Sequence, residues 1–546
     1  MKYSIGVDFG TGSGRVLIVD TKTGAVVGMS VIHFKNEKVK RNLVNVNIPY
    51  SFSLQDPTEY LRVLKEGIPE AIKKAGIHKN QIVGLGIDAT SASILPTDDQ
   101  FNPLSEYKIF KNEPHSYLKL WKHHGASKEA DKMLEVARDN KSRWLGNYGF
   151  NVNSEWMIPK VLELINYAPN IVKKAAHIVE VGDWLISKLI EENVRSNCSR
   201  GFKTFWNEEE GFFYDYYKKV NSQLPKVINE KMEGRLVKIG EKAGGISAEM
   251  STELALPTNL PIAPAIIDAH ASLLGIGSTQ KNELTMVMGT STCHLMLHDE
   301  QKQIPGISGN VKDAIIPDLF AYEAGQSAVG DLFSHIANRA PTSYIEEAKS
   351  KKMHIHELLE EKASLKPPGQ TGLIALDWHN GNRSILSDSK LRGVLIGETL
   401  NTKIEDIYKA YMEATAFGAK MIINNYEEWG MQIDKIFACG GIPQKNELLM
   451  QIYADILNRP ICVSASYYAP AIGAAILGSV AGREHETVVE AVQDMKQPIS
   501  KIVHPISQNV KNYQKLFEIY KTLHDYYGLQ SHDIMQQLDE LTHQHS

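Results

Sequence analysis

Two copies of one short pattern constrain the fold of this chain most: a strand, a tight turn of glycine and hydroxyl side chains, and a second strand. The first copy is "YSIGVDFGTGSGRVLIVD", and the second is "LTMVMGTSTCHLML". In each copy the turn separates two apolar runs, which predicts an antiparallel hairpin. Backbone N–H groups and hydroxyls in such a turn can surround an anion such as a phosphate. Because one copy opens each half of the chain, the sequence predicts duplicated domains that face each other across a nucleotide.

The letters of the first turn also resemble two unrelated motifs, which its context excludes, and a third, phosphate-binding motif is excluded as well. Asp8-Phe9-Gly10 spells the metal-binding tripeptide of protein kinases, but the chain has no His-Arg-Asp catalytic loop. The glycines at 10, 12 and 14 are one residue short of GxGxxG, and a strand follows them instead of a helix. A Walker loop is excluded because the sequence contains neither Gly-Lys-Ser nor Gly-Lys-Thr. Asp8 would end the first strand, where it could hold Mg²⁺; an ordinary hairpin remains the alternative.

Length and composition limit the class of protein. The chain has 546 residues, which is too long for one ordinary core, and 23% of them are charged with a formal net charge of -5. Such a charge balance provides no basic surface for nucleic acid or an anionic membrane. The four cysteines form no CxxC pair, which favours reduced thiols. Asp8 and Arg15 interrupt the apolar start of the chain, and the longest apolar run, Ile262–Gly277, is too short to span a bilayer. We therefore expect a cytoplasmic protein.

The remaining pattern predicts further strands and helices in both halves. Two buried strands run into acidic residues, one into Asp88 and one into Asp268. In the second half, a strand, a turn at Cys439-Gly440-Gly441 and a helix follow one another, and "APAIGAAILGSVAG" predicts a helix that packs closely on a neighbour. The amphipathic segment from Val510 to Leu541 fits a packing or oligomer helix, but a solvated helix is the favoured alternative, and a homodimer stays open. We place the boundary between an N-terminal domain, residues 1–279, and a C-terminal domain, residues 280–546.

These features resemble a known superfamily and, within it, a known family. The paired hairpins resemble those of the actin, hexokinase and Hsp70 superfamily, whose ribonuclease-H-like ATPase domains close on ATP. Ten motifs in order are similar to those of the FGGY family of carbohydrate kinases, in particular its members that phosphorylate L-ribulose. The ten are "GVDFGTGSGR", "HSYLKLWKHH", "NSEWMIPK", "NCSRGFKTFW", "DAHA", "MGTSTCH", "YEAGQSAVGD", "LDWHNGNRS", "ATAFGAK" and "CGGIPQKN".

The resemblance implies a catalytic role for Asp268, which matches the family's general base. Its carboxylate would accept the proton of the sugar's terminal hydroxyl as that oxygen attacks the γ-phosphate of ATP. From the residues alone, Asp268 could equally cap the turn after a buried strand. The positions implied for sugar binding are Ser91, Trp121, Lys203, Asp268 and Glu323. The residues alone leave structural alternatives open for four of these positions. In the order of the chain, they are a turn serine, a core tryptophan, a surface lysine and a solvated carboxylate.

For ATP and Mg²⁺, the resemblance implies contacts from both turns and from the glycine pair near residue 440. The positions implied for the nucleotide are Thr11, Gly12, Ser13, Arg15, Gly289, Thr290, Ser291, Gln326, Gly440, Gly441 and Asn446. Asp8 is the position implied for Mg²⁺. The loop Asp377–Ser384 is expected near the cleft without an assigned role. Because His123 and His124 are adjacent and have no third partner at motif spacing, we expect no structural metal.

The predicted protein is therefore an α/β kinase of two ribonuclease-H-like domains, with ATP and sugar in the cleft between them. It would convert L-ribulose and ATP to L-ribulose 5-phosphate and ADP. Two alternatives stay open: a kinase for another pentulose or pentitol, such as D-ribulose or xylulose, and an ATP-binding clamp that senses sugar without transferring phosphate.

Overall fold

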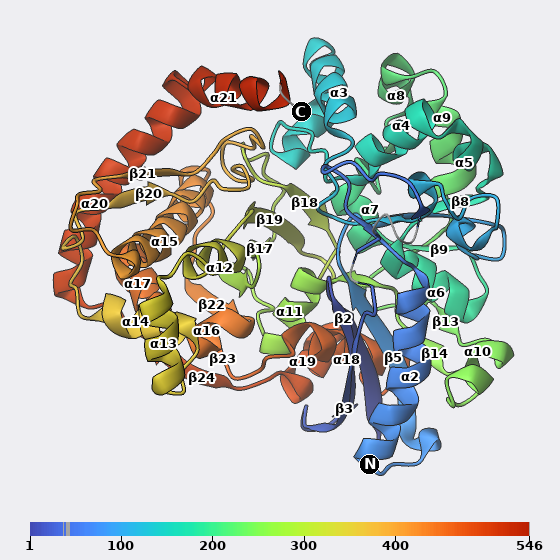
Figure 1. Cartoon of the computed structure of the whole chain (residues 1–546). Coiled ribbons are helices and arrows are strands. Elements are labelled where there is room, and N and C mark those ends of the chain that lie inside the picture. Colours follow the sequence, from blue (N-terminus) through green and yellow to red (C-terminus); the bar gives the residue numbers. More distant parts are fainter. Residues whose placement is uncertain (37, 40–43, 545–546) are drawn as a thin grey trace.

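Two seven-stranded sheets form the centres of the two halves of the molecule (Figure 1). The computed structural model describes residues 1–36, 38–39 and 44–544. The first sheet has the strands β13 (Gly244–Gly245), β14 (Pro261–Ile262), β5 (Ile82–Ala89), β1 (Tyr3–Phe9), β2 (Ser13–Asp20) and β3 (Val26–His33) in this order, with β15 (Ile266–Ile267) paired to β5. The second has β18 (Gly309–Lys312), β19 (Phe320–Gln326), β17 (Thr292–His298), β16 (Glu283–Met288), β22 (Lys435–Cys439), β23 (Ile461–Ser464) and β24 (Ile499–Val503).

The two sheets repeat one topology. In the first, β1, β2 and β3 form an antiparallel meander, and β5 runs parallel to β1 on its other side. In the second, β16, β17 and β19 form the same meander, and β22 and β23 continue the sheet in parallel from β16. Both glycine- and hydroxyl-rich turns thus connect the first two strands of a meander. This confirms the predicted α/β fold class with two duplicated units.

Helices cover the first sheet on both faces, which explains why its central strands are apolar throughout. All seven residues of β1 are buried. Helix α2 (Thr58–Ala75) packs on β2 and β3, whereas α18 (Ala469–Ala481) packs on β1 and β5. A strand covered on both faces has no solvent side, so it shows no alternation of polar and apolar residues.

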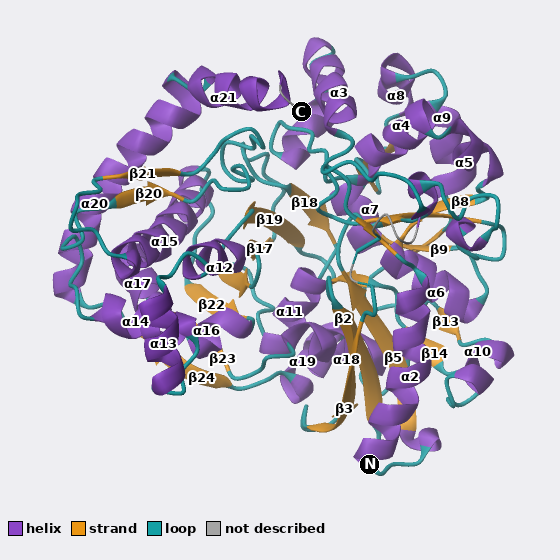
Figure 2. Cartoon of the chain, viewed as in Figure 1, coloured by secondary structure: helices purple, strands orange, loops and turns teal. Residues whose placement is uncertain are grey.

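Most other elements of the first half form a helical lobe beside the sheet (Figure 2). Its helices are α3 (Ser127–Asp139), α4 (Met157–Tyr167), α5 (Pro169–Lys174), α8 (Tyr214–Val220) and α9 (Leu224–Val227), which share one core. Helices α6 (Val181–Ile190) and α10 (Ala248–Glu253) pack in the core of the first sheet, and α7 (Asn197–Lys203) packs in the core that contains α11 and α18. A four-stranded sheet joins the lobe to the cleft, with β4 (Leu54–Gln55), β7 (Leu118–Lys119), β6 (Ile94–Thr97) and β8 (His177–Glu180). Two-stranded pairs complete it: β9 (Val194–Ser196) with β12 (Arg235–Val237), and β10 (Trp206–Asn207) with β11 (Gly211–Phe212).

Helices also surround the second sheet. They are α12 (Gly330–Ala337), α13 (Thr342–Ser350), α14 (Ile355–Ser364), α15 (Ile404–Glu428), α16 (Gly441–Lys445), α17 (Glu447–Leu457), α19 (Val488–Met495), α20 (Ser507–Asp525) and α21 (Asp533–Gln544). A small sheet of β20 (Ile374–Leu376) and β21 (Val394–Ile396) lies outside α15. Among the described residues, no helix combines the length and low polarity needed to cross a bilayer.

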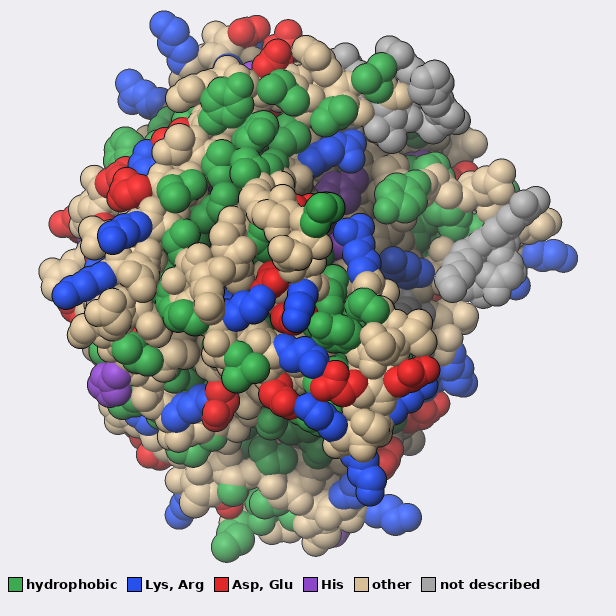
Figure 3. All heavy atoms as spheres, turned by 60° about the vertical axis from the view of Figure 1, so that its left-hand side comes forward, with side chains coloured by type: hydrophobic (Ala, Val, Ile, Leu, Met, Phe, Trp, Pro, Cys, Tyr) green, Lys and Arg blue, Asp and Glu red, His purple; other side chains and the backbone are tan. Residues whose placement is uncertain are grey.

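The C-terminal segment packs on the second half through one face of α20. Tyr513, Phe517 and Tyr520 of α20 are buried in the core that contains α15 and α17. Other apolar side chains beyond this face, including Ile519 and Leu529, are exposed. On the face shown in Figure 3, green hydrophobic side chains lie among charged ones of both signs. Packing, and not the favoured solvated helix, is therefore the role of α20, and a homodimer stays a prediction.

Helix α11 (Asp268–Ile276) lies beside α18 between the two sheets (Figure 1). The two helices touch backbone to backbone: a Cβ atom on Gly473 would lie 1.9 Å from the carbonyl oxygen of Ala271. On the sheet side, a Cβ on Gly86 would lie 2.0 Å from the carbonyl oxygen of Ala474. Glycine is therefore required at these positions by the close approach of the backbones. The predicted boundary between residues 279 and 280 falls between α11 and β16 and stays a proposal, because α18 belongs to the second half in sequence and packs on the first sheet.

We predict that Gly473→Ala destabilises the protein. The added methyl group cannot fit beside the Ala271 carbonyl, so α11 and α18 must separate, which overpacking data put at about 3 kcal/mol. Denaturant unfolding of the purified protein measures the loss. Gly441→Ala is the matched control, since a Cβ there meets no atom within 4 Å. Equal unfolding free energies for the two variants would contradict the packing argument.

Candidate active site

A cavity of about 560 Å³ lies between the two halves and takes its walls from both. The first half contributes the end of β1, the turn after it, the turn after β5, the segment after β7 and the start of α11. The second half contributes the β16–β17 turn, the end of β22, and the segment before α18. Its lining includes Asp8, Gly10, Thr11, Arg15, Thr90, Ser91, Trp121, Asp268, Ser272, Met288, Gly289, Thr290, Ser291, Cys293, Glu323, Arg383, Gly440, Gly441, Tyr467 and Tyr468.

The turn after β1 is held from several sides. Its Gly10 N–H donates to the Ser13 carbonyl at 3.1 Å, which closes the turn. Gln55 Nε2 donates to the Thr11 carbonyl, and Trp121 Nε1 donates to Thr11 Oγ1 at 3.5 Å. These bonds position the predicted phosphate turn relative to the four-stranded sheet that carries Gln55 and leads to Trp121.

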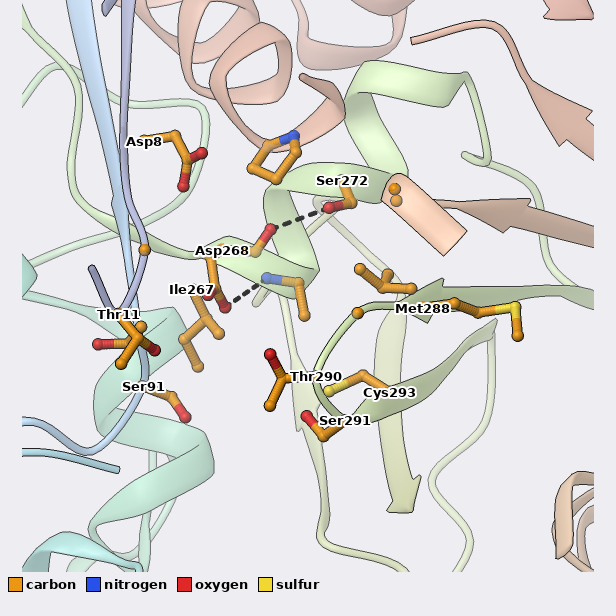
Figure 4. Close-up of a pocket in the computed structure, with 18 of the residues that line it drawn as sticks. Asp8, Thr11, Ser91, Ile267, Asp268, Ser272, Met288, Thr290, Ser291 and Cys293 are labelled. Atoms are coloured by element: carbon orange, nitrogen blue, oxygen red, sulfur yellow. Dashed lines mark hydrogen bonds between the residues drawn. The ribbon is translucent and has the colours of Figure 1, made fainter. Parts of the chain in front are cut away.

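The turn after β16 faces the first turn across the cavity. In Figure 4, Thr11 and Ser91 lie on one side of Asp268, and Thr290 and Ser291 lie on the other. The N–H of Gly289 donates to the Ser291 carbonyl at 2.9 Å, and Val329 N–H donates to the Thr290 carbonyl at 2.9 Å. The two turns have similar sequences but lie far apart along the chain, and the structure places them at one cavity.

Asp268 is the first residue of α11 and lies between the two turns (Figure 4). Its Oδ1 accepts from the N–H of Ala269 at 2.6 Å, and its carbonyl accepts from Ser272 Oγ at 3.1 Å. Burial, followed by the charge of Asp8, raises the pKa of Asp268 to about 7. A carboxylate with such a pKa can exchange a proton near neutral pH.

Two more carboxyl groups lie beside Asp268. Asp8 and Asp88 are paired in register across the parallel strands β1 and β5. Arg15 Nη1 donates to Asp8 Oδ2 at 2.7 Å, whereas neither oxygen of the buried Asp88 has a partner among the described residues. Burial and the charges of Asp8 and Asp268 raise the pKa of Asp88 well above its usual value. Acidic oxygens in excess of the positive charge of Arg15 fit a hard cation such as Mg²⁺.

The described residues contain no preformed cluster of three or more His, Cys, Asp or Glu side chains that could hold a metal by themselves. A Mg²⁺ ion here would need further oxygen ligands. Mg²⁺ in nucleotide sites usually takes these from phosphates and water. Asp8 lines the cavity and therefore fits a cation that is bound together with ATP.

Glu323 also lines the cavity and belongs to a buried chain of polar groups. Lys203 Nζ donates to Glu323 Oε1 at 2.7 Å, and His270 Nε2 lies 3.0 Å from Oε2. Burial alone would raise the pKa of Glu323, but Lys203 and His270 outweigh burial and hold that pKa well below its usual value. Burial lowers the pKa of His270, so the neutral ring donates from Nε2, while the Cys198 thiol, 3.2 Å from Nδ1, donates to the other nitrogen.

Arg383 also lines the cavity, although no role was predicted for its loop. The residue belongs to the Asp377–Ser384 loop of the second half. Its Nη2 donates to Glu155 Oε2 of the first half at 3.1 Å, and its guanidinium lies 5.5 Å from the Trp121 ring. The expected position near the cleft is therefore present. A basic residue in a polar, glycine-containing loop was the signal available in the sequence.

Two glycines and two tyrosines border the cavity at the second half. Gly440 has φ +104°, a conformation that favours glycine, and a Cβ there would lie 2.3 Å from the Met288 carbonyl oxygen. Gly441 begins α16 beside open space. Tyr467 and Tyr468 precede α18. Sequence reasoning missed both tyrosines, because the position of α18 determines which surface the preceding segment faces.

Five of the predicted site residues lie outside the lining of the cavity: Gly12, Ser13, Lys203, Gln326 and Asn446. Lys203 is bonded to Glu323, and two others are engaged in bonds elsewhere. Gln326 Nε2 donates to Asp377 Oδ2 at 2.9 Å and to the Thr415 carbonyl at 2.8 Å. Asn446 caps α17, where its Oδ1 accepts from Leu449 N–H at 2.7 Å. Their contact with a nucleotide stays a prediction, and the structure provides these other roles for their amide groups.

Comparison with known proteins gives matches over nearly the whole chain. The model of the N-terminal domain of the FGGY family of carbohydrate kinases matches residues 3–275, and the C-terminal domain model matches residues 284–482. Proteins named ribulokinase from Staphylococcus aureus are similar over 541 residues, 99% of each chain, with 53% identity for strain Newman and 52% for strain MSSA476.

Solved structures share the fold at low identity. Xylulose kinase from Rhodospirillum rubrum has a TM-score of 0.78 at 18% identity and covers 98% of this chain and 100% of its own. Plasmodium falciparum glycerol kinase with ADP has a TM-score of 0.72 at 18% identity and covers 96% and 98%. These two likenesses concern the fold alone, which is that of a two-domain sugar kinase.

We predict that Asp268→Asn raises the stability of the ligand-free protein at high pH. Because the folded-state pKa of Asp268 is raised, the folded state binds its proton more tightly than the unfolded chain does, and ionisation costs stability as pH rises from about 4 to about 7. The amide has no such cost, so the variant gains roughly 1–3 kcal/mol above pH 7 and little below pH 4. Denaturant unfolding at a series of pH values measures the difference. A gap that does not change with pH would contradict the raised pKa.

Proposed function

The chain belongs to the FGGY family of carbohydrate kinases, and on that premise we propose that it phosphorylates L-ribulose with ATP to give L-ribulose 5-phosphate and ADP. Membership makes the protein an ATP-dependent sugar kinase. The choice of L-ribulose is carried by one observation: the chain is 53% identical to a protein named ribulokinase over 99% of both chains. The xylulose kinases among the solved structures are 16–18% identical, which gives no support for a substrate.

Asp268 is the proposed general base. It would accept the proton of the sugar's terminal hydroxyl while that oxygen attacks the γ-phosphorus and the bond to the β-phosphate oxygen breaks. Its place at the start of α11, between the two turns, supports this role, since the acceptor oxygen and the γ-phosphate must meet there. Its pKa of about 7 suits a group that must be ionised to accept a proton and protonated afterwards.

The two turns are the proposed phosphate site. Backbone N–H groups and the hydroxyls of Thr11, Ser13, Thr290 and Ser291 would bind the phosphate oxygens. Asp8 would hold Mg²⁺, which neutralises phosphate charge when bound, and Arg15 keeps the Asp8 carboxylate in place through the 2.7 Å bond.

The sugar would lie at the Glu323 end of the cavity. Glu323 would accept from sugar hydroxyls, and Lys203 keeps this carboxylate ionised and fixed through the 2.7 Å bond. Ser91 and Trp121 line the same cavity, where a hydroxyl and an aromatic face suit a sugar ring or chain. Arg383 adds a cationic donor from the second half, in contact with Glu155 and close to the Trp121 ring.

The adenosine would lie against Gly440 and Gly441. A missing side chain at Gly441 leaves open space beside the start of α16, so the backbone can lie close to a base and ribose. Tyr467 and Tyr468 border this part of the cavity and offer aromatic faces.

We predict that L-ribulose is the best acceptor among the ketopentoses. Sugars that differ at one hydroxyl leave different buried polar groups unpaired, so kcat/KM should fall by roughly tenfold or more for D-ribulose, L-xylulose and D-xylulose. ADP release with each sugar measures the ratio, with release in the absence of sugar as the control. A preference for a xylulose would overturn the assigned substrate and leave the kinase activity intact. ATP binding without sugar-dependent ADP release would favour a sensing clamp.

We predict that Asp268→Asn lowers kcat by roughly 10²–10⁴-fold, because the sugar hydroxyl loses its proton acceptor. The affinity for MgATP should stay within about twofold, since the substitution removes a base and not a phosphate donor. Equilibrium titration with MgATP and steady-state ADP release measure the two quantities separately. Turnover close to that of the unaltered protein would show that the assigned base is wrong.

A further inference from the structure

Two sequence motifs have no place in the chemistry proposed above, although the structure brings them together. "HSYLKLWKHH" covers β7 and the segment with Trp121, and "NSEWMIPK" ends in the first turn of α4. Neither motif contributes a proposed catalytic group. The only residue of the two motifs with a proposed role is Trp121. Side chains of the two motifs, together with Glu163 of α4, hold the segment with Trp121 in place.

Lys160 of α4 connects the two first-half segments that line the sugar end of the cavity. Its side chain is fully buried, and Nζ donates to the carbonyl of Ala92 at 2.8 Å and to the carbonyl of Leu120 at 2.7 Å. Ala92 follows Ser91, and Leu120 precedes Trp121. One ammonium group thus fixes the distance between the two peptides next to the proposed sugar contacts.

The Ala92 peptide is held on its other side as well. Ala92 has φ +51°, in the left-handed region that costs an alanine backbone free energy. Its N–H donates to Glu180 Oε1 at 2.5 Å, while its carbonyl accepts from Lys160. Because an alanine does not adopt this conformation readily by itself, the two buried side chains supply the restraint.

Trp121 is restrained by a second residue of the same helix. Glu163, one turn after Lys160, accepts from Lys119 Nζ at 2.7 Å and lies 2.9 Å from His123 Nε2. Lys119 and His123 stand two residues before and two residues after Trp121. Burial lowers the pKa of His123 to about 3, so this ring is neutral and donates from Nε2. Helix α4 therefore holds the segment on both sides of Trp121.

Keeping a cation in this position has a cost. Burial lowers the pKa of Lys160 to about 7, which means that the folded protein disfavours the charged form relative to water. Among the described residues, the Lys160 ammonium donates to the two main-chain carbonyls alone, so it brings no reacting group to the cavity. What it provides is the geometry of the two peptides.

We propose that Lys160 is a positioning residue of the sugar subsite: by binding the Ala92 and Leu120 carbonyls it sets the spacing of Ser91 and Trp121, and this spacing discriminates among ketopentoses. The inference rests on the proposed sugar kinase function. It assigns no contact between Lys160 and the substrate, because the ammonium lies behind the two peptides and outside the cavity lining.

The test compares Lys160→Met with Lys409→Met. Lys409 of α15 is a matched control, since it is also buried and donates to main-chain carbonyls, those of Ala363 and Lys366, away from the cavity. In Lys160→Met, KM for the best ketopentose should rise by roughly tenfold, while KM for ATP changes by less than about twofold. The ratio of kcat/KM between the best and the next ketopentose should fall by roughly tenfold. Lys409→Met should lose thermal stability and keep both sugar values.

A rescue separates positioning from a general loss of structure. Glycine adopts a positive φ without the cost that alanine has, so Lys160→Met with Ala92→Gly should regain at least about threefold in ketopentose KM over Lys160→Met alone. If Lys160→Met does not fold, the double variant is compared with Ala92→Gly alone; a higher ketopentose KM and a lower selectivity are then expected, and equal values would overturn the proposal. Unchanged sugar KM and selectivity in folded Lys160→Met, or equal changes in Lys409→Met, would overturn the proposal. The best ketopentose is identified first with the unaltered protein. An error in the proposed substrate, L-ribulose, is therefore detected before the role proposed for Lys160 is tested.

Discussion

The backbone contact of α18 with β1, β5 and α11 is the constraint on which the rest of the structure depends. It takes a helix from the second half of the chain and places it against the first sheet, with glycine on either side of the contact. Since α11 starts with Asp268 and packs on α18, this contact also sets where the proposed base lies between the two turns. Glycine is required at these contacts because the backbones lie so close together that an added side chain would push them apart.

The cleft concentrates groups that are unfavourable without ligands. Asp8, Asp88 and Asp268 form one group, and the raised pKa values of Asp88 and Asp268 report the cost of that arrangement. Glu323 belongs to a second group, in which Lys203 and His270 stabilise its ionised form. The two groups thus have opposite character: one favours added positive charge, and the other presents a fixed acceptor. Such a division suits a site that receives a phosphate-bound cation and a polyhydroxyl compound side by side.

Much of this was predictable from the sequence, because the hairpins, the strand before Asp268 and the small-residue helix are local patterns. The positions of Thr11, Thr290 and Gly441 at the cavity follow from such patterns. Asn446 shows a missed local signal: an asparagine before a helix is a typical N-cap, and it has that role here. Lys160, Arg383 and Tyr468 could not be placed in this way. Their surroundings come from segments tens to hundreds of residues away, and a pattern of nearby residues contains no information about those distances.

The position of α18 has a consequence for how the protein is made. The first sheet is complete in strands long before the ribosome reaches residue 469, but one of its faces has no cover until α18 emerges. During synthesis, almost two hundred further residues must therefore be added after α11 before α18 can cover the apolar face of β1 and β5. A fragment that ends at the second hairpin would lack the same cover. The two halves look like separate units in the sequence, but the first half completes its core only when the second half has been synthesised.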